Sequence, residues 1–303
     1  MELTIVIPVH NRENLLGRTL QSIAGGQMLP HTLILVDNGS TDGSMALCRK
    51  FKEENEADNF HIIIVEEPKK GANAARNKGL SLCTTEWIYF FDSDDLFDQA
   101  FVSTISSIRN DEINCLICPT HMDVNGKSSI RNFKAQSDIP FQILTGMLST
   151  QAVVYRTEWL RSIGGWDEDL SVWQDLELGT RLLLHNTAIR WMPDHAFHTI
   201  FVHEESITGK RNSDNAEGRL QAIERIDSQL TTPLHRKALV LRTYILLGMF
   251  MREKDDEAIK KGKEFIEELF ADKYSVVGNL LATYVAHGGR GAWRIAYLLT
   301  RSL

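Results

Sequence analysis

The sequence predicts an α/β fold, with a mostly parallel sheet covered by helices on both faces and a helical C-terminal region. Two patterns lead to this prediction. In the first half of the chain, short apolar runs alternate with segments whose apolar residues recur at helical spacing, as in strands joined by covering helices. From about residue 214 onward only the helical pattern is present. We therefore expect a domain at residues 1–213 and a helical region at 214–303.

Strands and helices alternate regularly before residue 110. Leu16, Leu20 and Ile23 fall on one face of the first helix, at i, i+4 and i+7. The expected strands are 3–7, 33–36, 61–65 and 87–91, and the later helices are 42–51, 72–82 and one from about 97. Parallel strands end at one edge of a sheet, so residues that directly follow these strands should gather there.

The pattern becomes irregular after residue 110. The expected strands are 115–118, 151–155, 188–192 and 196–202, and a helix is expected at 175–184. The dipeptide Asn125-Gly126 is typical of a two-residue hairpin turn, because both positions of such a turn need a positive φ.

The composition excludes several classes of protein. The net charge of −7 argues against broad nucleic-acid binding, which needs a basic surface. The four cysteines are too few to form a disulfide framework in 303 residues. Cys115 and Cys118 have metal-site spacing, but they lie in an apolar run and no second pair follows. We expect a buried strand there.

The chain also lacks the usual signals for membrane insertion or export. The N-terminus has no basic segment before its apolar run, and Pro8 interrupts that run. The longest apolar stretch, 244–251, is far shorter than the roughly 20 residues that span a bilayer. We expect a cytoplasmic protein.

Polar residues follow three of the expected strands, at 8–12, 37–42 and 92–95. Residues 37–42 alone would be interpreted as a turn and a helix cap. The carboxylates of 92–95 repel one another unless a cation or hydrogen-bond donors compensate. Mg²⁺ and Mn²⁺ take oxygen ligands and can bridge a diphosphate, so we favour a metal site over a solvated turn.

Other nucleotide-binding motifs are absent from the sequence. The first expected strand is not followed by GxGxxG, and the chain contains no GxxxxGK[ST]. A dinucleotide-binding site and a P-loop are therefore not expected.

Six motifs together resemble family 2 glycosyltransferases of the GT-A fold, over roughly residues 1–210. In order they are VIPVHNR (6–12), VDNGSTDGS (36–44), GANAARNKG (71–79), DSDD (92–95), GGWDE (164–168) and WQD (173–175). The resemblance implies an inverting enzyme that moves a sugar from a nucleotide-diphosphate donor to a hydroxyl of a glycan or lipid-linked acceptor.

The resemblance also implies a donor site. Its residues would be Pro8, His10, Arg12, Asp37, Asn38, Arg76, Asn77, Asp92 and Ser93. Asn38 departs from the second acidic residue of many members. An amide can still accept from uracil N3–H and donate to a carbonyl, so a UDP-sugar is the expected donor.

The implied cofactor is Mn²⁺ or Mg²⁺, held by Asp94 and Asp95. His203 lies in a segment similar to a late family pattern. It is either a further metal ligand or a surface residue of a loop.

Asp175 would be the catalytic base that takes the proton of the acceptor hydroxyl. Gln174 is a second departure, because members often have Glu there. The alternative is that Asp175 only favours a helix N-terminus. Trp166 and Trp173 either stack on the acceptor sugar or belong to the core.

Residues 290–301 form a basic, amphipathic segment. It either makes peripheral contact with the inner face of the membrane or packs on its own domain. Two other interpretations of the whole chain stay open, a nucleotidyltransferase and a non-catalytic binding protein with the same fold.

Overall fold

The computed structural model describes residues 2–108, 112–131, 138–185, 188–192, 196–202, 211–271 and 274–302. They form two compact units, which we describe separately. The sheet unit holds the described residues of Met1–Ala135, Leu148–Asp169 and Thr187–His203. The helical unit holds those of Gln136–Met147, Leu170–Asn186 and Glu204–Leu303. The domain boundary expected after residue 213 stays a prediction.

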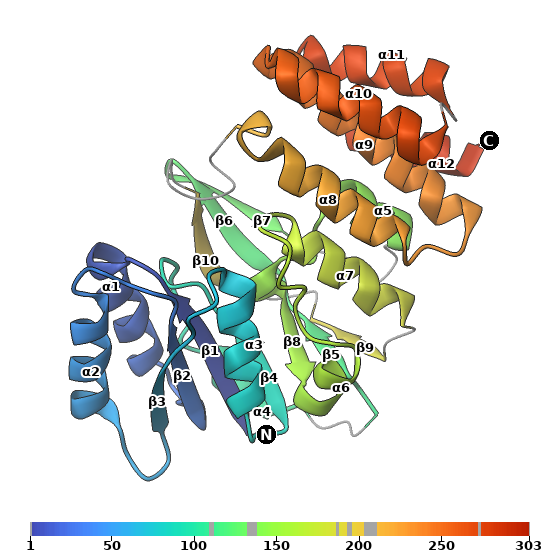
Figure 1. Cartoon of the computed structure of the whole chain (residues 1–303). Coiled ribbons are helices and arrows are strands. Elements are labelled where there is room, and N and C mark those ends of the chain that lie inside the picture. Colours follow the sequence, from blue (N-terminus) through green and yellow to red (C-terminus); the bar gives the residue numbers. More distant parts are fainter. Residues whose placement is uncertain are drawn as a thin grey trace. The chain divides into compact units, whose positions relative to one another are not determined.

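The sheet unit is built on a seven-stranded sheet with strand order β3-β2-β1-β4-β8-β5-β9 (Figure 1). The strands are β1 (Leu3–Val9), β2 (Thr32–Asp37), β3 (His61–Glu66), β4 (Trp87–Phe90), β5 (Cys115–Ile117), β8 (Val153–Arg156) and β9 (Ile189–Trp191). β8 runs antiparallel to both of its neighbours, and the other pairs are parallel. The predicted mostly parallel sheet is confirmed.

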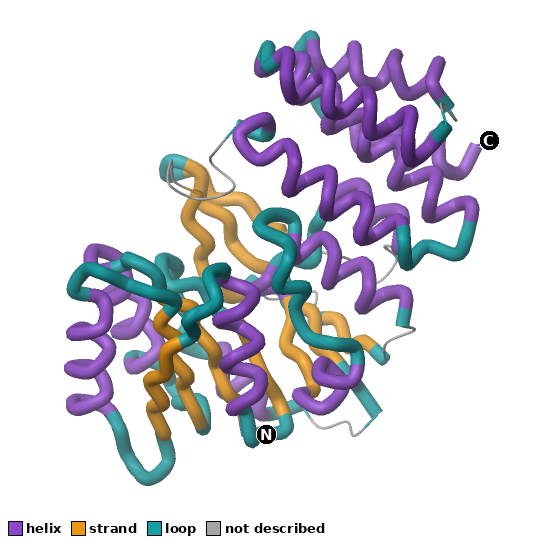
Figure 2. Tube along the Cα trace, viewed as in Figure 1, coloured by secondary structure: helices purple, strands orange, loops and turns teal. Residues whose placement is uncertain are grey.

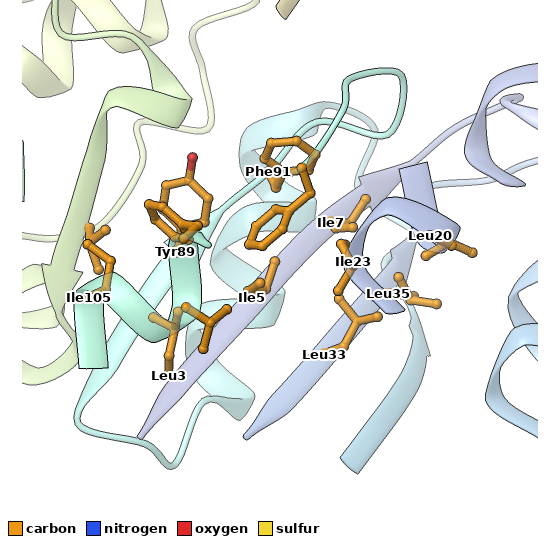
Figure 3. Packing of buried hydrophobic residues seen from close by; sticks show 14 of the residues in the cluster. Leu3, Ile5, Ile7, Leu20, Ile23, Leu33, Leu35, Tyr89, Phe91 and Ile105 are labelled. Carbon is orange, nitrogen blue, oxygen red and sulfur yellow. The ribbon is translucent and has the colours of Figure 1, made fainter. Parts of the chain in front are cut away.

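Helices cover both faces of this sheet. They are α1 (Glu13–Ala24), α2 (Ser44–Asn55), α3 (Ala72–Leu82), α4 (Phe101–Ser106) and α6 (Thr157–Ser162). On one face, side chains of β1 such as Ile5 and Ile7 pack with Leu20 and Ile23 of α1 (Figure 3). On the other face α3 contacts β1 closely, and a Cβ at Gly79 would collide with Val6. Side chains alternate along a strand, so neighbouring residues of β1 serve opposite layers.

A second, three-stranded sheet has the order β10-β6-β7. It consists of β6 (Thr120–Val124), β7 (Lys127–Arg131) and β10 (Phe197–Val202). Asn125 and Gly126 join β6 to β7 with φ values of 53° and 78°, so the predicted hairpin turn is confirmed.

Two local predictions differ from the structure. The helix expected from about residue 97 begins only at Phe101, because the segment before it pairs with β10. Leu96 bridges Thr199, and the N–H of Asp98 donates to Nδ1 of His198 over 3.0 Å. The strand expected at 151–155 begins at Val153, after the short 3₁₀ turn η1 (Thr150–Ala152).

The cysteines at 115 and 118 lie inside the sheet unit. Both are buried, and burial raises the pKa of the Cys118 thiol to about 12. A thiol with a raised pKa is a poor metal ligand and a poor nucleophile, which agrees with the expected buried strand.

The helical unit packs around one long helix, α9 (Pro233–Glu253). Around it lie α5 (Ile139–Thr145), α7 (Gln174–Leu184), α8 (Ala216–Asp227), α10 (Asp256–Phe270), α11 (Ser275–Ala286) and α12 (Ala292–Ser302), all purple in Figure 2. α9 contacts α5, α8, α10, α11 and α12, and it is apolar on most of its circumference, as expected of a central helix. Within the described residues, no helix has both the length and the hydrophobicity needed to cross a bilayer.

Candidate functional site

The three strands that end in polar residues are neighbours in the sheet. β1 lies between β2 and β4 and is parallel to both. Val9 at the end of β1 faces Asp37 at the end of β2, and Asp92 follows β4 closely. The sequence motifs at 8–12, 37–42 and 92–95 therefore share one edge of the sheet.

Hydrogen bonds join the segments that follow β1 and β2. Nδ1 of His10 lies 3.0 Å from the carbonyl oxygen of Asn38, a hydrogen bond when Nδ1 carries the proton. Asn11, with a φ of 51°, accepts the N–H of Thr41 over 2.8 Å through its side chain. The N–H of Arg12 donates to the Ser44 hydroxyl over 2.7 Å. These bonds fix His10 and Arg12 against the end of β2.

Asp37 and Asn38 are both buried but have different surroundings. Oδ1 of Asp37 accepts the N–H of Ser40 over 3.0 Å, which closes a turn. The Asn38 amide donates to the carbonyl oxygens of Glu67 and Lys69 over 2.9 and 2.8 Å. Its Oδ1 accepts the N–H of Gly71 over 2.8 Å. The Asn38 side chain thus holds the segment that leads into α3.

A buried arginine holds the carboxylate after β4. Arg76 is 4% exposed, and it donates to Asp92 Oδ1 over 2.9 Å and to Asn73 Oδ1 over 3.0 Å. Burial raises the pKa of Asp92, and the Arg76 charge opposes that shift. The Asp92 side chain remains 33% exposed, so it can accept hydrogen bonds from a ligand.

Asn77 fastens the GGWDE segment (164–168) to α3. Its amide donates to the Trp166 carbonyl over 2.9 Å and to Glu168 over 2.8 Å, and its Oδ1 accepts the Trp166 N–H over 2.9 Å. Gly165 has a φ of 64°, and a Cβ there would lie 2.7 Å from the Asn77 oxygen. The close approach and the backbone angle both require glycine. Asn77 therefore positions this loop.

Trp166 belongs to the core of the sheet unit. It is 2% exposed and packs edge to face on Phe90, with 5.3 Å between the ring centres. The guanidinium carbon of Arg76 lies 4.7 Å from the centre of the Trp166 ring. A sugar can stack only on an exposed aromatic face, so we assign Trp166 to packing rather than to the acceptor.

The two candidate metal ligands in the described part of the chain differ sharply. Asp94 is 16% exposed, and its carboxylate lies 3.6 Å from Nε of Arg12. Asp95 is 2% exposed and accepts hydrogen bonds from the Phe201 N–H, over 2.8 Å, and from the Gln151 amide. Burial, with the nearby carboxylates, raises the pKa of Asp95 to about 8. Asp95 thus ties residues 92–95, which we call the acidic turn, to β10.

The remaining candidate, His203, lies outside the described residues. Ser93 is buried, and its carbonyl oxygen accepts the hydroxyl of Thr19 over 3.0 Å. Pro8 lies within β1, opposite Val36 of β2.

The acidic turn suits a metal shared with a phosphate ligand. Among the described residues, no three His, Cys, Asp or Glu side chains cluster as a complete protein cage would require. Mg²⁺-type ions commonly use one or two carboxylates and fill their other positions with water and substrate phosphates. The charge of Asp94 contributes to the raised pKa of Asp92, and a cation bound at this turn would relieve that repulsion.

Two residues that support this edge were assigned no role from the sequence. Asn73 holds Arg76 and also donates to the Asp167 carbonyl over 2.7 Å. It shares a helix face with Arg76 and Asn77 at i, i+3 and i+4, a spacing that could have indicated its role. Gln151, the partner of Asp95, lies in a region without a motif.

In the helical unit, Asp175 lies in the first turn of α7, close behind Trp173, whose ring contacts two arginines. Trp173 precedes the helix with a φ of 57°, and the guanidinium groups of Arg242 and Arg219 lie 4.6 and 5.6 Å from its ring centre. Burial lowers the pKa of Arg242 to about 10, whereas the Asp175 charge acts in the opposite direction. The half-buried Trp173 ring therefore already carries cation contacts within its unit.

Glu177, the other acidic residue in the first turn of α7, has a structural role. It is 2% exposed and binds Arg181 through two hydrogen bonds of 2.7 and 2.9 Å. Gln229, in the turn that follows α8, donates to the same carboxylate over 2.9 Å. The Glu177 contacts join α7 to the turn after α8, so Asp175 is the carboxylate of this first helical turn that we consider for chemistry.

Comparison with known proteins gives two family matches. Residues 4–154 match the model for "Glycosyl transferase family 2", and residues 87–222 match "Glycosyl transferase family group 2". The minor teichoic acid biosynthesis protein GgaA of Bacillus subtilis is 29% identical over 194 residues, which is 60% of this chain and 43% of GgaA. The chain spans between 14% and 43% of the length of the first curated relatives that it matches.

Solved structures share the fold. TarS 1–349 of S. aureus, in complex with UDP-GlcNAc, superposes with a TM-score of 0.70 at 17% identity, covering 99% of this chain and 92% of that one. The mannosyltransferase PcManGT of Pyrobaculum calidifontis, in complex with GDP-Man and Mn²⁺, has a TM-score of 0.59 at 17% identity, with coverages of 99% and 85%.

Proposed function

The chain belongs to glycosyltransferase family 2 and has the GT-A fold, and from this premise we propose that it transfers a sugar from a nucleoside-diphosphate donor to an acceptor hydroxyl. The observation that carries the proposal is the edge shared by β2, β1 and β4. It gathers Asp37, Arg12, Asp92 and Asp94 at the carboxyl ends of parallel strands. A sugar nucleotide needs such a combination, because it presents hydroxyls, a base and an anionic diphosphate together.

We assign the donor contacts accordingly. Asp37 accepts a hydrogen bond from the base, and Asp92 accepts from hydroxyls of the ribose or the sugar. Arg12 lies beside Asp94 and meets the diphosphate. Asn38, Arg76 and Asn77 act mainly as positioning residues, because their polar atoms already bind protein groups. UDP is the favoured nucleotide, since the similarly folded TarS was crystallised with UDP-GlcNAc.

A divalent ion at Asp94, when bound, would supply positive charge that stabilises the departing nucleoside diphosphate. The presence of Mn²⁺ in the PcManGT complex supports this assignment. Asp95 contributes by holding the acidic turn against β10.

Asp175 supplies the general base of the proposed reaction. It removes the proton from the acceptor hydroxyl while that oxygen bonds to the anomeric carbon. The bond from this carbon to the diphosphate oxygen breaks in the same displacement, and the electron pair leaves with the nucleotide. A single displacement inverts the anomeric centre, so an α-linked donor gives a β-linked product.

We further propose a cell-envelope glycan or a lipid-linked precursor as the acceptor. The resemblance to GgaA, named for teichoic acid biosynthesis, supports this class. The enzyme would work in the cytoplasm, peripherally at the inner face of the membrane.

The test is a transfer assay with a panel of UDP-sugars and envelope glycan acceptors, in Mn²⁺ or in EDTA. Nucleotide release and the anomeric configuration of the product are measured. Asp175→Asn should lower kcat about 10²- to 10⁴-fold, the usual contribution of a general base. Asp169→Asn, at an exposed carboxylate, is the control and should keep wild-type activity. Undiminished transfer by Asp175→Asn would remove the base assignment.

A further inference from the structure

One side of the C-terminal helix α12 is already occupied within the helical unit. Trp293 and Tyr297 pack perpendicular to Phe141 of α5, with ring centres 5.6 and 6.2 Å away. The Tyr297 hydroxyl donates to Asp138 over 3.2 Å, and Arg301 forms an ion pair with the same carboxylate. The aromatic side of the segment at 290–301 therefore packs on its own unit. This is the second of the two alternatives given for that segment, the first being contact with the membrane.

Apolar side chains are instead exposed on α11. Val276, Leu280 and Tyr284 are 74%, 68% and 42% exposed, and they follow one another at i, i+4 and i+8. The opposite side of α11 carries the buried Leu281 and Val285 and packs on α9. The three residues form one stripe, which we call the α11 stripe. An exposed stripe of this kind usually marks a contact surface.

The end of the α11 stripe is shaped by the turn that follows it. Leu280, Tyr284, Thr283, His287 and Gly289 line a shallow hollow on this surface. The Tyr284 hydroxyl donates to the carbonyl oxygen of Arg290 over 2.9 Å. This bond fixes the exposed Arg290 beside the α11 stripe.

The same part of the chain is basic, although the whole chain is acidic. Residues 275–303 contain Arg290, Arg294 and Arg301 and no Asp or Glu, whereas the net charge of the chain is −7. On α12, Leu298 and Ile295 are also exposed, at 69% and 40%, and Arg294 is exposed beside them. The exposed apolar residues of α11 and α12 thus occur together with the exposed Arg290 and Arg294, whereas Arg301 is already paired with Asp138.

We propose that the α11 stripe docks on the surface of an anionic membrane. Val276, Leu280 and Tyr284 would enter the boundary between headgroups and acyl chains, and Arg290 would meet lipid phosphates. A second copy of the chain fits this surface less well. A two-fold contact through the stripe would bring the Arg290 side chains of both copies to one interface, without an acidic residue of this region to pair with them.

This inference names the surface through which the protein would contact the membrane. It rests only on the proposed peripheral location of the enzyme, not on the proposed sugar transfer. Vesicle binding needs neither donor nor acceptor, so its outcome is separate from that of sugar transfer.

The experiment is flotation of the full chain with vesicles of phosphatidylcholine, with or without phosphatidylglycerol, in the absence of nucleotide. We expect wild-type protein to float with the anionic vesicles and to lose binding as salt is raised. Leu280→Glu should reduce the vesicle-bound fraction about tenfold, because it places a charge in the apolar contact. Arg290→Glu should weaken binding to the vesicles that contain phosphatidylglycerol, and it should not change binding to pure phosphatidylcholine vesicles.

The matched control is Ile130→Glu, at an isoleucine of β7 that is 61% exposed in the sheet unit, and it should bind as wild type does. Circular dichroism and thermal melting check that each variant is folded. The proposal is overturned if the wild-type protein does not bind anionic vesicles, or if Leu280→Glu binds them as well as wild type does. It is also overturned if the wild-type protein is a dimer without lipid and the only effect of Leu280→Glu is to make it a monomer.

Discussion

The side chain of Asn38 makes hydrogen bonds that require an amide rather than a carboxylate. Two of them are donated to main-chain carbonyls, at Glu67 and Lys69, and one is accepted from Gly71. A carboxylate could keep the contact with Gly71 but would face the two carbonyl oxygens without a donor. The departure from the family's acidic residue therefore has a local structural reason in this chain.

Asn38→Asp should accordingly loosen the segment 67–71. We expect a loss of about 1–3 kcal/mol in the free energy of unfolding, the typical cost of leaving buried polar groups unpaired. Urea denaturation measures this loss, and titration with UDP should show weaker binding because the neighbouring Asp37 and His10 also shift. Asn279→Asp, at an exposed site on α11, should have neither effect. Wild-type stability of Asn38→Asp would contradict the assigned hydrogen bonds.

Helix α3 carries three polar residues that fasten other elements. Asn73 and Asn77 bind the 164–168 loop, and Arg76 binds Asp92. All three project from consecutive turns of the same face, so the helix works as a support for both the loop and the acidic turn.

Asn77→Ala should detach the 164–168 loop from α3. The change removes hydrogen bonds to Trp166 and Glu168, and we expect a destabilisation of about 1–3 kcal/mol by urea denaturation. The control on the same helix is Ser81→Ala. The Ser81 hydroxyl donates a solvent-exposed hydrogen bond to the Lys78 carbonyl oxygen within α3. Equal stability of the two variants would show that the loop does not depend on Asn77.

The first turn of α9 contains a histidine that responds to pH. Burial lowers the pKa of His235 below its usual value, although the charge of Asp138 opposes the shift. The folded state therefore favours neutral His235, and this contribution to stability is complete above the unfolded pKa of about 6.5. As the pH falls through the folded pKa, the unfolded state binds more protons and the contribution is lost.

We therefore expect the free energy of unfolding to fall below pH 6.5, by at most about 1.4 kcal/mol per pH unit from this group. Urea denaturation between pH 7.5 and 5.5 should show a smaller decrease for His235→Phe than for wild type. The control variant is His287→Gln, at an exposed position directly after α11. An unchanged slope in His235→Phe would contradict the assignment.

For the whole molecule, the sequence predicted the order of elements well where local pattern and tertiary packing agree. The strands from Leu3, Thr32, His61 and Trp87 are apolar because both faces of a parallel sheet are covered. The Asn125-Gly126 turn was predictable because few residues adopt its backbone angles. The helix near residue 97 was displaced by pairing between Leu96 and Thr199, a contact between distant positions that no local pattern signals.

The candidate site was predictable in its composition but less so in the role of each residue. The motifs correctly indicated that the ends of β1, β2 and β4 share an edge. They did not indicate that Asn38, Asn77 and Asp95 bind groups of the protein itself. Their partners are mainly main-chain atoms of distant residues, which leave no trace in residue type.

The central claim is that the edge of the sheet at Asp94 binds a nucleotide together with a divalent ion. Calorimetric titration of the folded protein with UDP and GDP, in Mn²⁺ and in EDTA, tests it most directly, with Asp94→Asn beside the control Asp169→Asn. We predict that UDP binds more tightly than GDP, that Mn²⁺ strengthens binding, and that only Asp94→Asn loses the Mn²⁺-dependent part. Binding of neither nucleotide by folded wild-type protein, or full Mn²⁺ dependence in Asp94→Asn, would contradict the claim.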